Sequence, residues 1–489
     1  MLTQLNNQSL ATINAEVNKP KYCREDLTAG IVHIGVGNFH RAHQAMYMHH
    51  LLNQGEATQW ALIGAGTKSY DVAMRDKLAQ QDWLTSVVEV DANGRQAHIN
   101  GAMIDFVENT PPAVIDTLVQ PNIRIVSLTI TEGGYFIDEK TGGFNIFHSE
   151  IAHDIDHPQA PISVFGIIIE ALRIRRSNGI APFTVMSCDN IPHNGKVTKA
   201  ATTQLAAAID TSLATWIADN VSFPNSMVDC ITPGTSDLER QKIKDLFGYD
   251  DQAPVFCEPF RQWILEDDFC NGRPALEQVG VEFVPDVAPY ELMKLRILNG
   301  GHAAIAYPGA LLGIQYVHEV MAHPLISRYL AKLESLDIIP SLPEVPNVEL
   351  PEYFALIQQR FANPEVKDTV TRLCQDGSNR LPKFILPIVN ANLVNGQSLQ
   401  GLALVVALWC RLCAQGADGD NQIVLDDAQA PRLIAQSLLA RDNPLVFLQM
   451  DDIFGTLAVQ PEFVAAFSKW LTMLWEVGAA KTLAFYLED

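Results

Sequence analysis

Along the first half of the chain, short apolar runs rich in β-branched residues alternate with segments in which apolar residues recur every three or four positions. The short runs predict buried strands over 31–34, 60–63, 124–130 and 183–186. The segment 163–176 has helical spacing, and Ser163 stands where a helix N-cap is expected. Strands and helices that follow one another in this way are typical of an α/β domain.

From about residue 285 the pattern changes, and long helical periods dominate. The spacing predicts helices over 291–312, 355–361, 399–414, 430–440 and 461–477. We therefore predict an α/β domain with insertions over residues 1–285, followed by a predominantly α-helical domain over residues 286–489. A cleft between two such domains is where a ligand is expected.

The composition of the chain disfavours some classes of binding partner. With 48% hydrophobic and 18% charged residues, the chain of 489 residues is predicted to be globular and well buried. Its net charge of −22 disfavours nucleic acids and anionic membrane surfaces as partners, because both are negatively charged. An anionic cofactor can still bind where backbone N–H groups and a few cations attract it locally.

The N-terminal segment lacks the basic start and apolar centre of a secretory signal. No apolar run reaches the length of about 18 residues that a membrane span requires. Eight cysteines scattered along the chain are typical of thiols in a reducing compartment. We expect a cytoplasmic protein.

The strand expected over 31–34 leads directly into a glycine turn and then into a helical segment. Gly35 would permit the tight turn and Gly37 the close approach of backbone to a pyrophosphate, while the helix N-terminus supplies N–H donors. This setting predicts a Rossmann-type dinucleotide site at Gly35, Val36, Gly37, Asn38 and Phe39. The third glycine of the usual fingerprint is replaced by His40, so an ordinary strand-to-helix turn is the alternative interpretation.

The second strand does not end in the acid that usually binds the ribose hydroxyls of NAD. Thr67 and Lys68 follow it instead, and a lysine suits the 2′-phosphate of NADP better than a diol. We expect NAD as the cofactor, with NADP not excluded.

Three polar residues lie within an apolar helical frame over 290–312. At about 100° per residue, Lys294 and His302 lie about 80° apart on an α-helix, and Asn299 lies about 140° from Lys294. An amine, an amide and an imidazole would then share one side of the helix, where they are costly to bury unpaired. The alternative is a set of satisfied polar groups on an ordinary packing helix.

Two further segments carry polar groups that suit a ligand site. Residues 187–195 follow a predicted strand, at the end of the sheet where α/β domains bind ligands, although a plain turn has the same composition. Residues 371–383 place three cations around a glycine-containing turn, which is also typical of a solvated loop. No histidine, cysteine or carboxylate spacing predicts a metal site; His318 and His323, for example, are five residues apart rather than four.

Several motifs in one order resemble those of the long-chain polyol dehydrogenases, the family of mannitol 2-dehydrogenase and fructuronate reductase. The resemblance covers nearly the whole chain. It rests on GVGNFHRAH (35–43), SLTITEGGY (127–135), SCDNIPHNG (187–195), MVDCITP (227–233), KLRILNGGHAAIAYPG (294–309) and DGSNR (376–380). It implies a metal-independent enzyme that oxidises a secondary alcohol with a nicotinamide cofactor.

The resemblance also implies roles for single residues. Lys294 would be the general base, Asn190 and Asn299 would hold the developing oxyanion, and His302 would orient the substrate. An exposed lysine with a pKa near 10.4 is a poor base, but desolvation in a closed site lowers that pKa. The remaining implied roles are a proton relay at Glu291 and substrate hydroxyl ligands at Asp229, Arg372 and Arg380.

The resemblance implies a linear polyol and its 2-ketose as substrates, most readily D-mannitol and D-fructose. The pair D-mannonate and D-fructuronate is the alternative, since the two arginines suit a carboxylate as well as hydroxyls. Another alternative is a non-catalytic nicotinamide-binding protein that keeps only the glycine turn. The sequence leaves the oligomeric state open. Members of the family that prefer NAD tend to carry an acid where this chain has Lys68.

Overall fold

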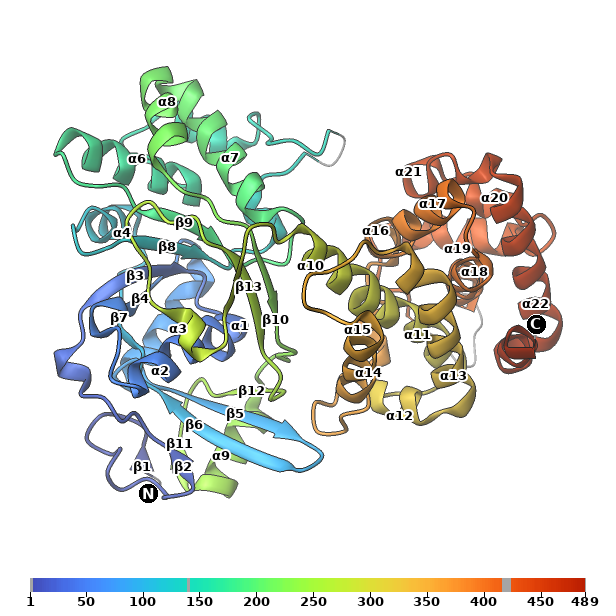
Figure 1. Ribbon diagram of the computed structural model, residues 1–489, viewed down its shortest axis with the longest axis horizontal. Helices are drawn as coiled ribbons and strands as arrows, with labels where there is room; N and C mark the ends of the chain where they lie inside the picture. The colour runs from blue at the N-terminus through green and yellow to red at the C-terminus, as the bar shows by residue number, and fades with distance from the viewer. Residues whose placement is uncertain (1–2, 139–140, 416–423, 489) are drawn as a thin grey trace. The chain divides into compact units, whose positions relative to one another are not determined.

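A computed structural model of the chain describes residues 3–138, 141–415 and 424–488. It divides into two compact units, Met1–Ala288 and Pro289–Asp489. The first unit combines a parallel sheet with helices on both faces, and the second consists of helices (Figure 1). The predicted fold class, a Rossmann-type α/β unit followed by a predominantly α-helical one, is confirmed.

The central sheet of the first unit has five parallel strands in the order β7-β4-β3-β8-β9. Their bounds are Met103–Phe106 for β7, Ala61–Ala65 for β4, Ala29–Ile34 for β3, Ile125–Leu128 for β8 and Thr184–Ser187 for β9. The four strands expected from the sequence are β3, β4, β8 and β9, each within three residues of its predicted ends. Strand order reverses between β3 and β8, and the crevice at such a reversal is where open α/β sheets bind ligands.

Both faces of this sheet are largely buried, which explains why its strands are mainly apolar rather than alternating. Val32 and Ile34 of β3 pack on one side with α4 (Pro111–Leu118), α6 (Val164–Ser177) and α7 (Asn194–Ile209). Ile31 faces the opposite side and packs with α2 (Gln44–Asn53). Ser163 caps α6 as expected, because its Oγ accepts the N–H of Gly166 at 3.0 Å.

The first unit also contains smaller sheets that the sequence analysis did not anticipate. One has the order β12-β5-β6-β2, in which β5 (Thr85–Asp91) and β6 (Gly94–Asn100) form a hairpin; β2 is Val17–Asn18 and β12 is Val255–Cys257. Another joins β10 (Ser226–Asp229), β13 (Gln262–Glu266) and β14 (Glu282–Val284). These strands are the insertions that extend the domain beyond its central sheet.

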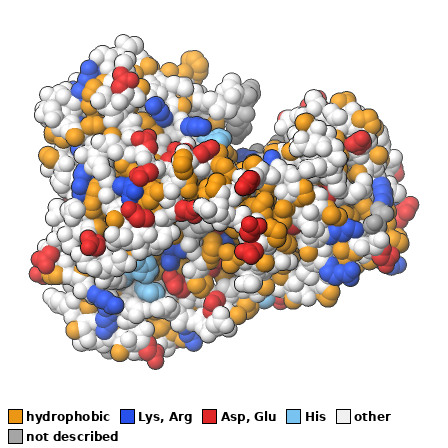
Figure 2. Space-filling view, in the orientation of Figure 1, with side chains coloured by type: hydrophobic (Ala, Val, Ile, Leu, Met, Phe, Trp, Pro, Cys, Tyr) orange, Lys and Arg blue, Asp and Glu red, His pale blue; other side chains and the backbone are white. Residues whose placement is uncertain are grey.

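The second unit is built around α18 (Gln400–Gln415), whose residues Leu402 to Cys410 are fully buried. It packs against α22 (Pro461–Glu488), α19 (Ala430–Leu439) and α11 (Gly300–Leu311). The predicted helix over 461–477 ends at Gly478, whose φ of 80° and ψ of 172° are not helical, and a second helical segment follows within α22. Among the described residues, no helix is both long and apolar enough to cross a membrane. On the face drawn in Figure 2, basic side chains stand among acidic ones.

Candidate active site

The glycine turn follows β3 and has the geometry that the sequence predicted. Gly35 has φ of +98°, and a Cβ added there would lie 2.0 Å from the backbone oxygen of Thr129. Only glycine fits both the backbone angle and the space at this position. Gly37 differs, because a Cβ there would meet nothing closer than the Gly35 oxygen at 4.0 Å. The backbone at Gly37 is therefore open on the side where a side chain would project.

The turn borders a cavity of about 500 Å³ at the carboxyl ends of β3, β4 and β8. This volume lies in the range of small-molecule sites. Four of the residues predicted to bind a cofactor line the cavity, namely Gly35, Val36, Gly37 and Lys68. Other lining residues come from the segment after β8 and from the region before α6; they include Thr129, Ile130, Thr131, His148, Glu150 and Val164.

Asn38 and Phe39 are not among the residues that line this cavity. Both begin α1 (Asn38–Ala42), which stops at His43 before α2 begins, so the helix expected after the turn is interrupted. The Asn38 Nδ2 donates to the Pro233 oxygen and the Thr235 Oγ1, each at 3.0 Å. The Phe39 ring stacks on His43 with centroids 4.8 Å apart. The side chains of both residues hold the turn rather than face the cavity.

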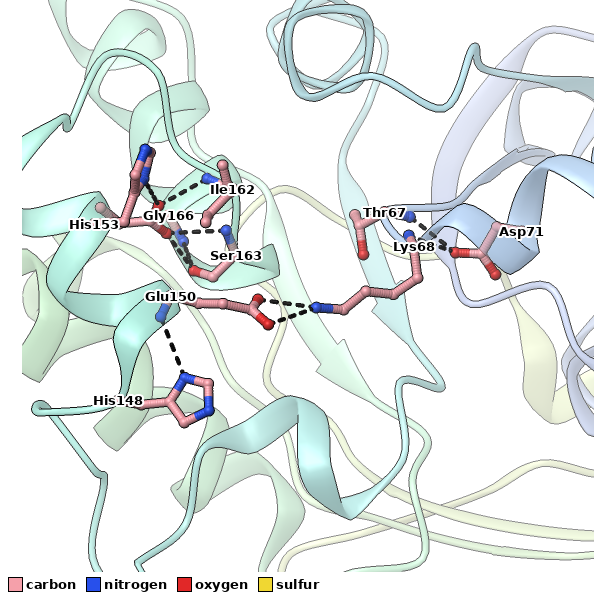
Figure 3. Close-up of polar contacts among 10 residues, drawn as sticks. Thr67, Lys68, Asp71, His148, Glu150, His153, Ile162, Ser163 and Gly166 are labelled. Atoms are coloured by element: carbon pink, nitrogen blue, oxygen red, sulfur yellow. Dashed lines mark hydrogen bonds and ion pairs between the residues drawn. The ribbon is translucent and has the colours of Figure 1, made fainter.

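Lys68 does line the cavity, but its ammonium group is paired. Its Nζ lies 2.9 Å from each carboxylate oxygen of Glu150, which belongs to α5 (Ser149–Asp156) (Figure 3). The Asp71 Oδ2 accepts the N–H groups of Thr67 and Lys68, both at 2.9 Å, and so caps α3 (Ser69–Ala79). The cation that the sequence analysis associated with a 2′-phosphate therefore faces a carboxylate.

Asp189 explains part of the motif that follows β9. Its Oδ2 and Oδ1 accept the N–H groups of Ile130 and Thr131, both at 2.9 Å, and the Tyr135 hydroxyl donates to Oδ2 at 2.7 Å. Burial raises the pKa of Asp189, while these hydrogen bonds lower it. Asp189 thus holds the segment after β8 against the cavity. Asn190 is exposed, and Asp229 is buried at the end of β10.

The segment with Lys294 and Asn299 is not the regular α-helix that the predicted angles assumed. Residues Lys294–Asn299 form a π-helical turn between α10 (Ala288–Met293) and α11. Because hydrogen bonds there close over five residues instead of four, the expected separations of about 80° and 140° are wrong for this backbone. π-Helical turns inside α-helices occur frequently at functional sites. Lys294 is 7% exposed, and Glu291, in α10 before it, is partly buried.

Besides the Arg296 Nε, two polar atoms of this segment are buried with no hydrogen-bond partner among the described residues, the Asn299 Oδ1 and the His302 Nε2. An unpaired buried polar group costs about 1–3 kcal/mol. A ligand hydroxyl can both donate and accept, so it can satisfy either atom. These two atoms lie on the π-helical turn and on the first turn of α11, where the sequence analysis expected the reacting end of the substrate.

The charges of three arginines act on His302. Burial, and then the charges of Arg372, Arg380 and Arg360, lower the pKa of His302 well below its ordinary value of 6.5. The His302 ring stacks on Phe361 with centroids 3.9 Å apart. Arg360 and Phe361 end α14 (Leu350–Phe361), a helix whose spacing was recognised but whose position beside His302 was not. No local sequence signal indicated either residue.

The two predicted arginines differ in their surroundings. The Arg372 guanidinium is engaged by Asp368, with the Nε 2.6 Å from Oδ1, and its side chain is 54% exposed. Arg380 is partly buried, and its Nε has no hydrogen-bond partner among the described residues. Asp368 accepts from only two of the Arg372 nitrogens, so both arginines keep N–H donors for a ligand, and that of the Arg380 Nε is buried.

The histidines near the glycine turn are packing residues. His40 is buried and stacks on His33 with centroids 3.4 Å apart, and His33 hydrogen bonds Ser127 Oγ and Thr129 Oγ1, both at 2.8 Å. Within the described ranges, no group of three or more histidine, cysteine or acidic residues is arranged to hold a metal ion.

Family models match most of the chain. Residues 29–278 match the model described as the mannitol dehydrogenase Rossmann domain, and residues 286–475 match the mannitol dehydrogenase C-terminal domain. The match covers both the unit with the glycine turn and the unit with the π-helical turn.

Individual relatives match over nearly their full length. A protein named mannitol 2-dehydrogenase from Cereibacter sphaeroides is 50% identical over 473 residues, which cover 96% of this chain and 99% of the relative. The solved structure of the Pseudomonas fluorescens mannitol 2-dehydrogenase in ternary complex with NAD and D-mannitol is 43% identical, with a TM-score of 0.89 and full coverage of both chains. The structure of a D-sorbitol dehydrogenase in substrate-free form is 34% identical, with a TM-score of 0.90, over 99% of this chain and 100% of that one.

Proposed function

The chain belongs to the mannitol dehydrogenase family, and on that premise we propose that it interconverts D-mannitol and D-fructose with NAD as the cofactor. The observation that carries the proposal is the full-length similarity to a mannitol 2-dehydrogenase solved with NAD and D-mannitol. The cavity beside the glycine turn and the buried polar groups at Lys294, Asn299 and His302 provide chemistry suited to this reaction.

The glycine turn has the features that a dinucleotide requires. Gly35 permits the sharp turn, and the open side of Gly37 leaves room for the pyrophosphate next to the backbone. Bound NAD supplies the acceptor for the hydride that leaves C2 of the polyol. Gly35, Val36 and Gly37 would hold the cofactor, and Asp189 would keep the opposite wall of the cavity in place through Ile130 and Thr131.

Proton transfer is assigned to Lys294. Its amine is nearly buried, and desolvation favours the neutral form that can accept a proton. The Nζ would take the proton of the C2 hydroxyl, and Glu291, one turn earlier, would pass it on to solvent. The amides of Asn190 and Asn299 would donate hydrogen bonds to the alkoxide, a role for which other enzymes use a metal ion. We propose that this reaction proceeds without a metal ion.

Substrate orientation is assigned to His302 with Asp229, Arg372 and Arg380. Because burial and the nearby arginines keep His302 neutral, its ring can donate through one nitrogen and accept through the other. The unpartnered His302 Nε2 suits a hydroxyl of the polyol. The buried Nε of Arg380, which has no partner among the described residues, suits a second hydroxyl, and Arg372 keeps N–H groups beyond the two that Asp368 accepts.

The test is the substitution Lys294→Ala in the full-length enzyme. We expect turnover of D-mannitol to fall by about 10²–10⁴-fold, the usual loss for a general base, with NAD affinity nearly unchanged. Lys481→Ala is the matched control, because Lys481 is exposed on α22. Turnover that survives Lys294→Ala would contradict the role of Lys294, and NAD binding without turnover in the wild type would favour a non-catalytic protein.

The substrate preference is tested with a panel of polyols, sugars and sugar acids. Oxidation of D-mannitol, D-sorbitol and D-mannonate with NAD, and reduction of D-fructose and D-fructuronate with NADH, are measured under one set of conditions. We expect the highest kcat/KM for the mannitol and fructose pair. A clear preference for D-mannonate and D-fructuronate would assign the protein to the fructuronate reductase branch instead.

A further inference from the structure

The Lys68–Glu150 pair lies where a Rossmann-type domain distinguishes the two nicotinamide cofactors. In this fold, the ribose of the adenosine is recognised at the end of the second strand, here β4. Lys68 is the one lysine or arginine among the described residues that line the cavity, and it follows that strand. Taken alone, it would attract the 2′-phosphate of NADP.

Glu150 removes that attraction. Both of its carboxylate oxygens lie 2.9 Å from the Lys68 Nζ, so the ammonium group is directed at α5. Glu150 lines the same cavity, and so does Asp71. A phosphate placed at Lys68 would meet the Glu150 carboxylate next to it, and like charges at contact distance oppose binding.

The segment that carries Glu150 is built into the fold. The Asp154 side chain, one turn further along α5, is fully buried. Its Oδ1 accepts the N–H of Ile162 at 2.7 Å, and its Oδ2 accepts the N–H of Ser163 at 3.0 Å (Figure 3). A Cβ on Gly166 would lie 2.2 Å from the Asp154 Oδ2, so α6 approaches α5 closely at this point. These contacts fix α5, and with it Glu150, at the rim of the cavity.

Folding stability does not explain why the Lys68–Glu150 ion pair is present. The Lys68 and Glu150 side chains are 42% and 29% exposed. Ion pairs exposed to this degree contribute little to folding, because water and salt screen them. The geometry points to a role toward the ligand, and we propose that Glu150 determines cofactor choice, holding Lys68 away from the ribose and disfavouring the 2′-phosphate. The inference rests on the proposed function, because it takes the cavity to be the cofactor site.

The experiment compares the wild type with Glu150→Gln, Lys68→Gln and the double variant. For each, kcat/KM is measured with NAD and with NADP at saturating D-mannitol, and the dissociation constants of NADH and NADPH are measured by fluorescence titration. We expect Glu150→Gln to raise kcat/KM for NADP about tenfold and to change that for NAD less than about threefold. In the double variant most of the gain should disappear, because no ammonium group remains to bind the phosphate and only the repulsion by Glu150 is relieved.

The control is Glu56→Gln, which removes the same charge from an exposed position that does not line the cavity. If the ratio of kcat/KM for NADP to kcat/KM for NAD in Glu150→Gln stays within about twofold of wild type, the proposal is overturned, since Asp71 would then suffice to reject NADP. An equally large gain in the double variant would also overturn it, because Lys68 would then not be the group that Glu150 holds away from the phosphate. The dissociation constants of NADH and NADPH test the proposal in the same way even if D-mannitol is not the substrate. If neither cofactor binds, the assignment of the cavity as the cofactor site is refuted.

Discussion

Replacing Gly35 by alanine is expected to lower the melting temperature of the first unit. The φ of +98° costs a residue with a side chain about 1–2 kcal/mol. The new Cβ would lie 2.0 Å from the Thr129 oxygen, 1.0 Å closer than the 3.0 Å below which real Cβ contacts essentially never fall. Forcing β3 and β8 apart to relieve such a contact costs about 1–3 kcal/mol more.

The sum, about 2–5 kcal/mol, corresponds to a decrease in melting temperature of roughly 5–15 °C for a unit of this size. The assay is thermal unfolding followed by circular dichroism, with Gly37→Ala as the matched control. Gly37 has φ of −90° and space for a Cβ, so this variant should unfold near the wild-type temperature. Its defect should instead be at least about tenfold weaker NAD binding by calorimetry, because the methyl group would occupy the side open to the pyrophosphate.

The two variants separate folding from binding. Equal melting temperatures for Gly35→Ala and Gly37→Ala would show that the conformation of Gly35 is not what the turn requires. Wild-type NAD affinity in Gly37→Ala would refute the assignment of this turn to the cofactor.

Three further predictions concern buried ionisable groups. Burial lowers the pKa of His49 to about 3, so below about pH 6.5 the unfolded chain takes up a proton at this residue while the folded chain does not. His49→Gln should therefore reduce the dependence of the unfolding free energy on pH by up to about 1.4 kcal/mol per pH unit, measured by urea unfolding between pH 4.5 and 7. Glu334 has the opposite effect on stability, because burial raises its pKa well above 4.5 and the folded state loses stability as the pH rises. Glu334→Gln should raise the melting temperature relative to wild type at pH 8 but not at pH 4, and an equal difference at both pH values would contradict this. Asp189→Asn should lower the free energy of unfolding by about 1–3 kcal/mol and raise the KM for NAD, because an amide cannot accept hydrogen bonds from Ile130, Thr131 and Tyr135 together as the carboxylate does. An unchanged KM would show that the position of the segment after β8 does not depend on these hydrogen bonds.

Much of the fold could be predicted because the strands and helices that matter are recognisable from their immediate neighbours. The strands β3, β4, β8 and β9 are buried on both faces, so their sequences are short and mainly apolar runs. Ser163 caps α6 through a bond to a residue three positions away. The hairpin of β5 and β6 was missed, since its strands mix buried and exposed positions without a clear alternation.

The candidate site was predicted in part. The glycine turn was recognised because its requirements, a positive φ and a close backbone approach, are met within a few residues of one strand. The roles that the family motifs imply for Lys294, Asn299 and His302 stay predictions. The α-helical spacing assumed for them was wrong, because a single π-helical turn leaves the apolar character of the segment unchanged while altering its rotation.

The sequence by itself determined the class of fold and the family, because local spacing and residue identity encode these directly. Only the tertiary structure decided what surrounds each group. Lys68 meets Glu150, a residue 82 positions later, and His302 meets Phe361 and three arginines from other helices. Charge and hydrogen-bonding capacity depend on such neighbours, so whether a lysine attracts a phosphate is settled by how the chain packs and not by the lysine alone.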